Sequence, residues 1–271
     1  MSADPWDALR EHTQARIGLG RAGAGMPTRR HLELVAAHAT ARDAVHTPLD
    51  VAALATRLRT LDIGDPLPVA SAAPDRATYL LRPDLGRELA AGTVLPSVGA
   101  DIGVTLCDGL SAMALHTHGV ELAREIIAAL PGWTFAAPVI ATQARVALGD
   151  EIGSRLGVGT MLVLIGERPG LSVADSLGVY LTHHPRPGRT DAERNCVSNI
   201  RPPHGLGYRH AARVVAALVA GARRLGASGV ALKDTGPAGA LDPSGSSHAE
   251  RLATYPLDQS RGAHATPNTA E

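Results

Sequence analysis

The sequence is poor in aromatic residues, and this shortage limits the kind of core it can form. Only 3% of the 271 residues are aromatic, whereas 45% are hydrophobic. The core must therefore be built mainly from aliphatic side chains. A chain of this length and hydrophobicity can bury a substantial core, and it suits one large domain or two small ones.

Lysine is almost absent, with Lys233 as the one example, and the basic residues are balanced by acidic ones. The formal net charge is +0 and the isoelectric point is about 7.2. General nucleic-acid binders carry a marked excess of positive charge on one face. We therefore expect no nucleic-acid partner.

Cysteines and long apolar runs are also scarce. Cys107 and Cys196 lie far apart and form neither a metal-binding pattern nor the disulfide framework of a small secreted domain. No apolar run approaches the ~18 residues of a membrane-spanning helix. The first residues lack the basic and apolar regions of a secretory signal. We expect a cytoplasmic protein without a membrane partner.

Residues 100–235 alternate between strand-like and helix-like patterns. The expected strands are 102–107, 135–142, 161–165, 177–182 and 230–232, and the expected helices are 110–118, 121–130, 150–156 and 208–225. Strands separated by helices indicate a parallel sheet that is covered on both faces. The sequence therefore predicts an α/β fold with a Rossmann-like, mostly parallel sheet.

The two ends of the chain differ from this central part. Residues 1–99 are expected to form a mostly helical docking region, with helices at 4–16, 28–46, 51–61 and 84–90 and a strand at 79–84. Residues 236–271 are rich in proline, glycine, serine, threonine and histidine and have almost no apolar periodicity. Such a segment buries little apolar surface, so we predict a disordered tail.

A candidate site follows the apolar run from Met161 to Ile165. This run predicts a buried strand, and Pro169 in the following turn cannot extend the strand's hydrogen bonding. Glu167 therefore stands at the carboxyl end of a strand, where open α/β sheets bind ligands. Its carboxylate could accept hydrogen bonds from ligand amides or hydroxyls, or it could pair with Arg168, and the spacing alone leaves both readings open.

Specific motifs surround this stretch and extend along most of the chain. They are IGERPGL at 165–171, DSLGVYL at 175–181, RTDAERNCVSNIRP at 189–202, RIGLGRAG at 16–23, YLLRPDLGREL at 79–89, CDGLSA at 107–112 and SGVALKD at 228–234. With these motifs in consistent order, the chain resembles the small subunit (light chain) of ethanolamine ammonia-lyase, an adenosylcobalamin-dependent enzyme. The resemblance covers roughly residues 6 to 234.

The resemblance implies three cofactor-binding residues, Val146, Glu167 and Cys196. Glu167 is the glutamate of GERPGL, and Cys196 is the cysteine of the segment that ends in SNI. Without the resemblance, Cys196 would be read as a packed small hydrophobic residue. Val146 is assigned from its distance to Glu167 along the chain, and it can offer only apolar and backbone contacts. No residue of this chain is assigned to catalysis or to a metal ion.

The same resemblance implies a partner and a reaction. The chain would pair with a large subunit whose TIM-barrel active site binds ethanolamine and deaminates it to acetaldehyde and ammonia. The cofactor's Co–C bond breaks homolytically, and the adenosyl radical abstracts hydrogen from the substrate. Enteric members carry a long N-terminal extension that directs them to a bacterial microcompartment. This chain begins almost at its Trp6 helix, so loading into a microcompartment through an N-terminal signal is not expected.

Two other functions are compatible with parts of the sequence. The segment GLSAM at 109–113 is close to the nucleophile elbow G-x-S-x-G, which would make the chain a stand-alone α/β hydrolase that uses Ser111. However, Met113 replaces the second glycine, and serine is also favoured at a helix start, which is the simpler interpretation. The other alternative is a non-catalytic cobalamin-binding module.

Three further patterns point away from additional sites. The segment ALHTHG at 114–119 is close to the D-x-H-x-x-G loop that supplies a histidine to cobalt, but Ala114 replaces the aspartate that would orient the imidazole. A base-on cofactor is therefore expected. His183 and His184 lack a third metal ligand at suitable spacing, which favours a polar strand end. The G-x-G-x-x-G pattern at 18–23 lacks the preceding strand of a dinucleotide site.

Overall fold

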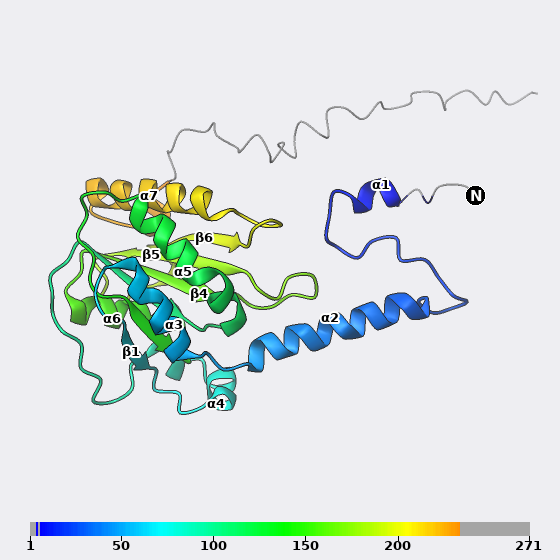
Figure 1. Cartoon of the computed structure of the whole chain (residues 1–271), viewed down its shortest axis with the longest axis horizontal. Coiled ribbons are helices and arrows are strands. Elements are labelled where there is room, and N and C mark those ends of the chain that lie inside the picture. The colour runs from blue at the N-terminus through cyan, green and yellow to red at the C-terminus, as the bar shows by residue number, and fades with distance from the viewer. Residues whose placement is uncertain (1–3, 5, 234–271) are drawn as a thin grey trace, which may run out of the picture. The chain divides into compact units, whose positions relative to one another are not determined.

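A six-stranded mixed sheet forms the centre of the fold (Figure 1). The computed structural model describes residue 4 and residues 6–233. The strands are β1 (Leu67–Ala70), β2 (Ile102–Cys107), β3 (Val139–Thr142), β4 (Thr160–Gly166), β5 (Leu177–His183) and β6 (Asn195–Ile200). Their order across the sheet is β1-β3-β2-β4-β5-β6. The predicted tail at 236–271 lies outside the described residues.

The sheet confirms the α/β class but corrects the prediction of a mostly parallel, Rossmann-like sheet. β1, β3, β2 and β4 are parallel neighbours, whereas β5 is antiparallel to β4 and β6 is antiparallel to β5. The reason lies in the connection between β4 and β5, which contains no helix. Parallel neighbours need a long crossover connection, whereas a short loop returns the chain antiparallel.

Helices cover both faces of the sheet. In the described residues they are α1 (Asp7–Arg10), α2 (Thr28–His46), α3 (Val51–Leu58), α4 (Arg76–Leu81), α5 (Ala112–Ala128), α6 (Leu148–Leu156) and α7 (Tyr208–Leu225). One apolar core joins α3, α5 and α7 to the sheet, and a second core joins α6 to the other face. None of these helices is long and apolar enough to span a membrane.

Several elements match the sequence predictions, namely β2, α2 and α7. α7 buries one face of aliphatic side chains and ends at Gly226, which adopts a left-handed conformation. Unlike α7, α2 is mostly exposed, since Ala44 is the one buried residue among its 19. Residues 51–61 are helical throughout, since α3 continues into a 3-10 turn at Arg59–Leu61. β1 comes from the part of the chain before residue 99, and the domain limits at 99 and 235 stay predictions.

The predictions of a strand at 79–84 and of separate helices at 110–118 and 121–130 were wrong for local reasons. The helix expected at 84–90 is only a 3-10 turn at Leu85–Arg87. The strand expected at 79–84 is the end of α4, because Asp75 caps that helix by accepting a 2.7 Å hydrogen bond from the Thr78 N–H. The two helices expected at 110–118 and 121–130 are one helix, α5. Gly119 lies inside α5, where an added Cβ would be only 3.3 Å from the Leu106 side chain of β2. The glycine therefore allows close packing against the sheet.

The sequence analysis also missed two strands at the edges of the sheet. β1 has four residues and contains a proline, which is tolerated at a sheet edge. β6 forms the other edge and is mostly polar or exposed, so it lacks the apolar run by which buried strands are recognised. The predicted strand at 230–232 was wrong, because Gly229–Ala231 forms a 3-10 turn.

Candidate functional site

The site lies at the carboxyl edge of the parallel strands, beside the loops that follow β2 and β4. β3 and β4 flank β2 on opposite sides, and such a switch in strand order is where open α/β sheets bind ligands. The two loops touch closely. A Cβ on Gly109 would lie 2.3 Å from the Gly166 carbonyl oxygen, and one on Gly166 would lie 2.1 Å from the Ser111 carbonyl oxygen. Glycine is therefore required on both loops.

A cavity of about 360 Å³ opens beside these loops. It is lined by Tyr79, Gly109, Leu110, Arg145, Val146, Ile165, Gly166, Glu167, Arg168 and Tyr180. Two residues that were selected from the sequence, Val146 and Glu167, thus lie on one cavity. Cys196 is not among the lining residues, but its cross-strand neighbour Tyr180 is.

Glu167 is half-buried, and its carboxylate is held in place by β6 and by Ser176, just before β5. The Ser198 hydroxyl donates to Oε1 at 2.6 Å, and the Ser176 hydroxyl donates to Oε2 at 2.7 Å. The backbone N–H of Asn199 lies 3.3 Å from both oxygens. These contacts fix the direction of the carboxylate. The Asn199 N–H is shared between the two oxygens, so three donors leave about one of the roughly four acceptor positions of an ionised carboxylate for a ligand.

Cys196 lies in strand β6, which the sequence analysis did not predict. The residue is exposed and pairs with Tyr180 across the strands. Partial desolvation raises the pKa of the Cys196 thiol, and the nearby Glu167 carboxylate raises it further. Burial raises the pKa of Tyr180 to about 12, and the neighbouring Cys196 contributes to the rise. Both side chains are therefore neutral at pH 7.

Val146 is positioned by a carboxylate that the sequence analysis did not select. Asp108, which follows β2, accepts hydrogen bonds from the backbone N–H groups of Gln143 (2.8 Å) and Ala144 (3.0 Å). The loop that carries Val146 is therefore tied to the end of β2. Burial raises the pKa of the Asp108 carboxyl, although these two hydrogen bonds oppose the rise. The sequence signals were its position at a strand end and its place in the motif CDGLSA at 107–112.

Tyr79 and Arg145 form the wall of the cavity next to Val146. Tyr79 is fully buried, and its hydroxyl donates to the Ala144 carbonyl oxygen at 3.0 Å. The Arg145 guanidinium lies over the Tyr79 ring, 4.3 Å from the ring centre. A second guanidinium, that of Arg76, lies 4.8 Å from the same centre. The sequence analysis missed this arrangement, which no local motif signals.

The structure confirms that Ser111 is the residue at a helix start. It is the buried N-cap of α5 and accepts from the Ala114 N–H at 3.2 Å. Its hydroxyl hydrogen is donated to the Ala174 carbonyl oxygen at 2.8 Å. A serine nucleophile must instead give this hydrogen to a general base.

His116, the histidine of the segment ALHTHG, already has a hydrogen-bond partner. Its Nε2 accepts from the Asp50 backbone N–H at 2.9 Å.

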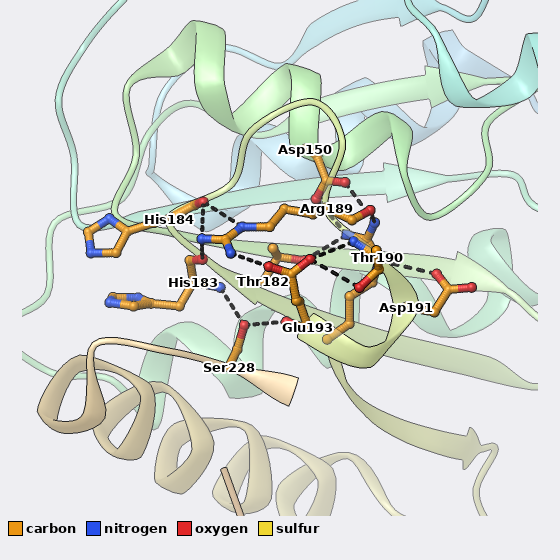
Figure 2. Close-up of polar contacts among 10 residues, drawn as sticks. Asp150, Thr182, His183, His184, Arg189, Thr190, Asp191, Glu193 and Ser228 are labelled. Atoms are coloured by element: carbon orange, nitrogen blue, oxygen red, sulfur yellow. Dashed lines mark hydrogen bonds and ion pairs between the residues drawn. The ribbon is translucent and has the colours of Figure 1, made fainter. Parts of the chain in front are cut away.

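A polar network at the other end of β5 holds the start of β6 (Figure 2). Arg194 forms two hydrogen bonds with Asp150, at 2.5 and 2.7 Å, and both side chains are only 3% exposed. Arg189 pairs with Glu193 and also donates to the carbonyl oxygens of His183 and His184. All of these hydrogen bonds join residues of the chain to one another, and Arg194 immediately precedes the first residue of β6.

The histidine pair lies beside this network. His183 is the last residue of β5, which confirms the predicted strand end, and its Nδ1 lies 2.9 Å from the Thr160 hydroxyl. Across the part of the chain that the structure describes, no group of three or more histidine, cysteine, aspartate or glutamate residues could hold a metal ion.

Comparison with known proteins assigns the chain to a family. The family described as ethanolamine ammonia-lyase light chain (EutC) matches residues 3–233. The chain is 59% identical to the ethanolamine ammonia-lyase small subunit of Rhodococcus erythropolis, over 88% of this chain and 93% of that one. It is 48% identical to the small subunit of Ralstonia nicotianae, over 86% and 90%, and 49% identical to that of Azotobacter vinelandii, over 90% and 93%. The chain therefore belongs to the ethanolamine ammonia-lyase light chain family.

Proposed function

We propose that this chain is the small subunit of an adenosylcobalamin-dependent ethanolamine ammonia-lyase. In this role it holds the cofactor against a large subunit, which binds ethanolamine and deaminates it to acetaldehyde and ammonia. The observation that carries the proposal is the shared position of Val146 and Glu167 on one cavity at the switch in strand order. Family membership supports the reaction and the presence of a partner.

The chemistry of the cavity fits part of a cobalamin. Cobalamin carries amide side chains around an apolar ring, so its site needs hydrogen-bond acceptors, donors and apolar surface. Glu167 supplies a fixed acceptor, Val146 supplies apolar contact, and Arg145 has a buried Nε without a hydrogen-bond partner among the described residues. We assign Cys196 to the rim of the site, because it adjoins Tyr180.

The size of the cavity indicates that this chain covers only part of the cofactor. Ligand sites for drug-sized molecules range from ~300 to 1,000 Å³, and cobalamin is larger than such molecules. The cavity of about 360 Å³ therefore accommodates only a portion of the cofactor. The remaining surface must be covered by the partner subunit, which fits a cofactor that is bound between two chains.

The division of labour follows from the residues at the site. When bound, adenosylcobalamin supplies radical chemistry through homolysis of its cobalt–carbon bond, and the protein supplies position and electrostatics. Glu167 orients amide groups of the cofactor, and Val146 excludes water from its apolar surface. No residue of this chain is assigned to proton transfer or to ethanolamine. The cofactor is base-on in this proposal, because His116 is engaged by Asp50.

The test compares the chain alone with the chain co-expressed with a large subunit from the same organism. Acetaldehyde formation from ethanolamine and the absorption spectrum of added adenosylcobalamin are the two measurements. We expect turnover only from the complex. Turnover by the single chain would contradict the proposal, and so would a complex that binds no cobalamin. Cobalamin binding by the single chain with no further effect of the large subunit would favour the cobalamin-binding module instead.

A further inference from the structure

Arg145 occupies a rigid position on the cavity wall. The loop that carries it is fixed by Asp108 on one side, and the Arg145 backbone N–H donates to the Gly86 carbonyl oxygen at 2.8 Å on the other. Its guanidinium lies over the buried ring of Tyr79 at 4.3 Å. A guanidinium stacked on an aromatic ring keeps its plane and its N–H directions. The side chain is therefore ordered before any ligand arrives.

The hydrogen-bonding capacity of this guanidinium is almost unused. An arginine carries five N–H donors. Within the described residues, the Arg145 side chain makes one hydrogen bond, from Nη2 to the Tyr79 carbonyl oxygen, and at 3.5 Å it is at the limit of a hydrogen bond. Its Nε is buried and unpartnered, and no carboxylate of the described chain forms an ion pair with it.

Arg194 shows what a structural arginine looks like in the same fold. Its donors are taken up by both oxygens of Asp150, by the Thr182 hydroxyl and by the Arg189 carbonyl oxygen. Nothing remains for a ligand. Buried polar groups in proteins are normally satisfied in this way. Among the described residues, three arginines have a buried donor without a partner, namely Arg76, Arg145 and Arg201, and of these three Arg145 is the one that lines the cavity.

The two charged residues of the cavity, Glu167 and Arg145, bind different kinds of ligand atom. Glu167 can only accept hydrogen bonds when ionised, whereas Arg145 can only donate them. We infer that Arg145 is a further cofactor-binding residue, which donates hydrogen bonds to an electron-rich oxygen of the cofactor. This inference rests on the proposed function. The oxygen is either a carbonyl of an amide side chain or a phosphate oxygen, since both match a planar guanidinium.

The test measures affinity in the assembled complex and does not depend on turnover. Wild type and Arg145→Met are titrated with cyanocobalamin, followed by absorption, and with dicyanocobinamide, which lacks the phosphate-bearing nucleotide loop. We expect R145M to weaken cyanocobalamin binding about tenfold or more, the loss typical of a hydrogen bond to a charged group. A matching loss with cobinamide identifies an amide carbonyl, and a loss with cyanocobalamin alone identifies the phosphate.

Arg209 is the matched control, because its side chain is 83% exposed and it does not line the cavity. Arg209→Met is expected to stay within about threefold of wild type, as exposed charges contribute little. Unchanged affinity in R145M, or an equal loss in R209M, overturns the inference. A wild-type complex that binds neither probe overturns the proposed function itself. Co-purification with the large subunit verifies assembly. Should R145M not assemble, Arg145→Ala is titrated, and wild-type affinity in that variant overturns the inference as well.

Discussion

The Ser198 hydroxyl donates a 2.6 Å hydrogen bond to Glu167 Oε1, which joins the end of β4 to β6 across the intervening strand β5. Ser176, just before β5, holds the other carboxylate oxygen. One side chain thus links three neighbouring strands at the edge of the sheet where the cavity opens. Glu167 therefore contributes to local structure, and experiments must separate this contribution from its proposed role in ligand binding.

Replacement of Glu167 is expected to weaken cofactor binding in the assembled enzyme. Glu167→Ala removes an acceptor whose charge-assisted hydrogen bond is worth about 1.5–3 kcal/mol, or roughly ten- to a hundredfold in affinity. With saturating adenosylcobalamin, turnover should largely recover, because the residue is not assigned to substrate. The measurement is a titration of the apoenzyme that is followed by activity and by the cobalamin spectrum.

Ser198→Ala separates the two roles of Glu167. This variant removes one internal hydrogen bond but keeps the carboxylate at the cavity. It should lose little cofactor affinity and should lower the melting temperature less than Glu167→Ala, which also removes the contacts with Ser176 and Asn199. If Glu167→Ala binds the cofactor normally yet has lost turnover at saturation, then Glu167 acts on the reaction, and the proposed division between the subunits is wrong.

Cys196→Ala is expected to have a weaker effect than Glu167→Ala. The thiol is neutral at pH 7, because desolvation and the nearby carboxylate raise its pKa, and a neutral thiol is a weak hydrogen-bonding group. Its affinity loss for adenosylcobalamin should remain under about tenfold. The same titration measures it. A loss larger than that of Glu167→Ala would show that Cys196 is the main contact and that the rim position is wrong.

The predictable part of the site came from buried parallel strands. β2 and β4 are buried along their whole length and mostly apolar, so the sequence located their ends, and with them Glu167 at the carboxyl edge. β6 could not be recognised in the same way. As an edge strand with exposed Ser198 and Asn199, its sequence has the composition of a loop.

The unpredicted part of the site depends on contacts between residues that are distant in the sequence. Asp108 holds the loop that carries Val146 through backbone N–H groups 35 and 36 residues away. Arg145 and Tyr79, which stack on each other, are 66 residues apart. Neither contact has a period or a motif. The Asp108 contacts go to backbone groups, which do not constrain the residue type at the partner position, and the stacked side chains of Arg145 and Tyr79 are too far apart in sequence to form a pattern. Only the folded sheet brings these groups together.

The buried ion pair between Asp150 and Arg194 is expected to be essential for stability. Asp150→Ala leaves the Arg194 guanidinium buried without its carboxylate, which costs about 3–5 kcal/mol. Removing both charges, in Asp150→Ala with Arg194→Met, should cost less than the sum of the single changes, since no unpaired charge remains. Denaturant unfolding of the four proteins measures this coupling.

The exposed pair of Arg82 and Asp84 is the matched control for the buried pair. Their side chains are 60% and 55% exposed, so Asp84→Ala should change the free energy of unfolding far less than Asp150→Ala does. The prediction is contradicted if Asp84→Ala and Asp150→Ala lose similar free energies of unfolding. It is also contradicted if the effects of Asp150→Ala and Arg194→Met are additive.

Stability should fall as the pH drops below neutral, in part because of His118. Burial lowers the pKa of His118 below its ordinary value of 6.5, although Asp175, 3.6 Å away, opposes this shift. Below pH 6.5 the unfolded chain therefore binds a proton that the folded chain excludes. This contribution is complete above pH 6.5 and is lost as the pH falls towards the folded pKa. His116 and His183, whose pKa values are also lowered by burial, add to the same trend.

His118→Asn removes the titrating ring from this environment, which also contains Arg201 and the Tyr208 hydroxyl, 2.6 Å from the His118 Nδ1. The melting temperature of the variant should decline less steeply between pH 7.5 and 5.5 than that of wild type, whatever the cost of the substitution at neutral pH. The exposed His204 provides the control, and His204→Asn should keep the wild-type slope. An unchanged slope in His118→Asn would mean that the acid sensitivity arises elsewhere, because the linkage requires that a group with different folded and unfolded pKa values contribute to it.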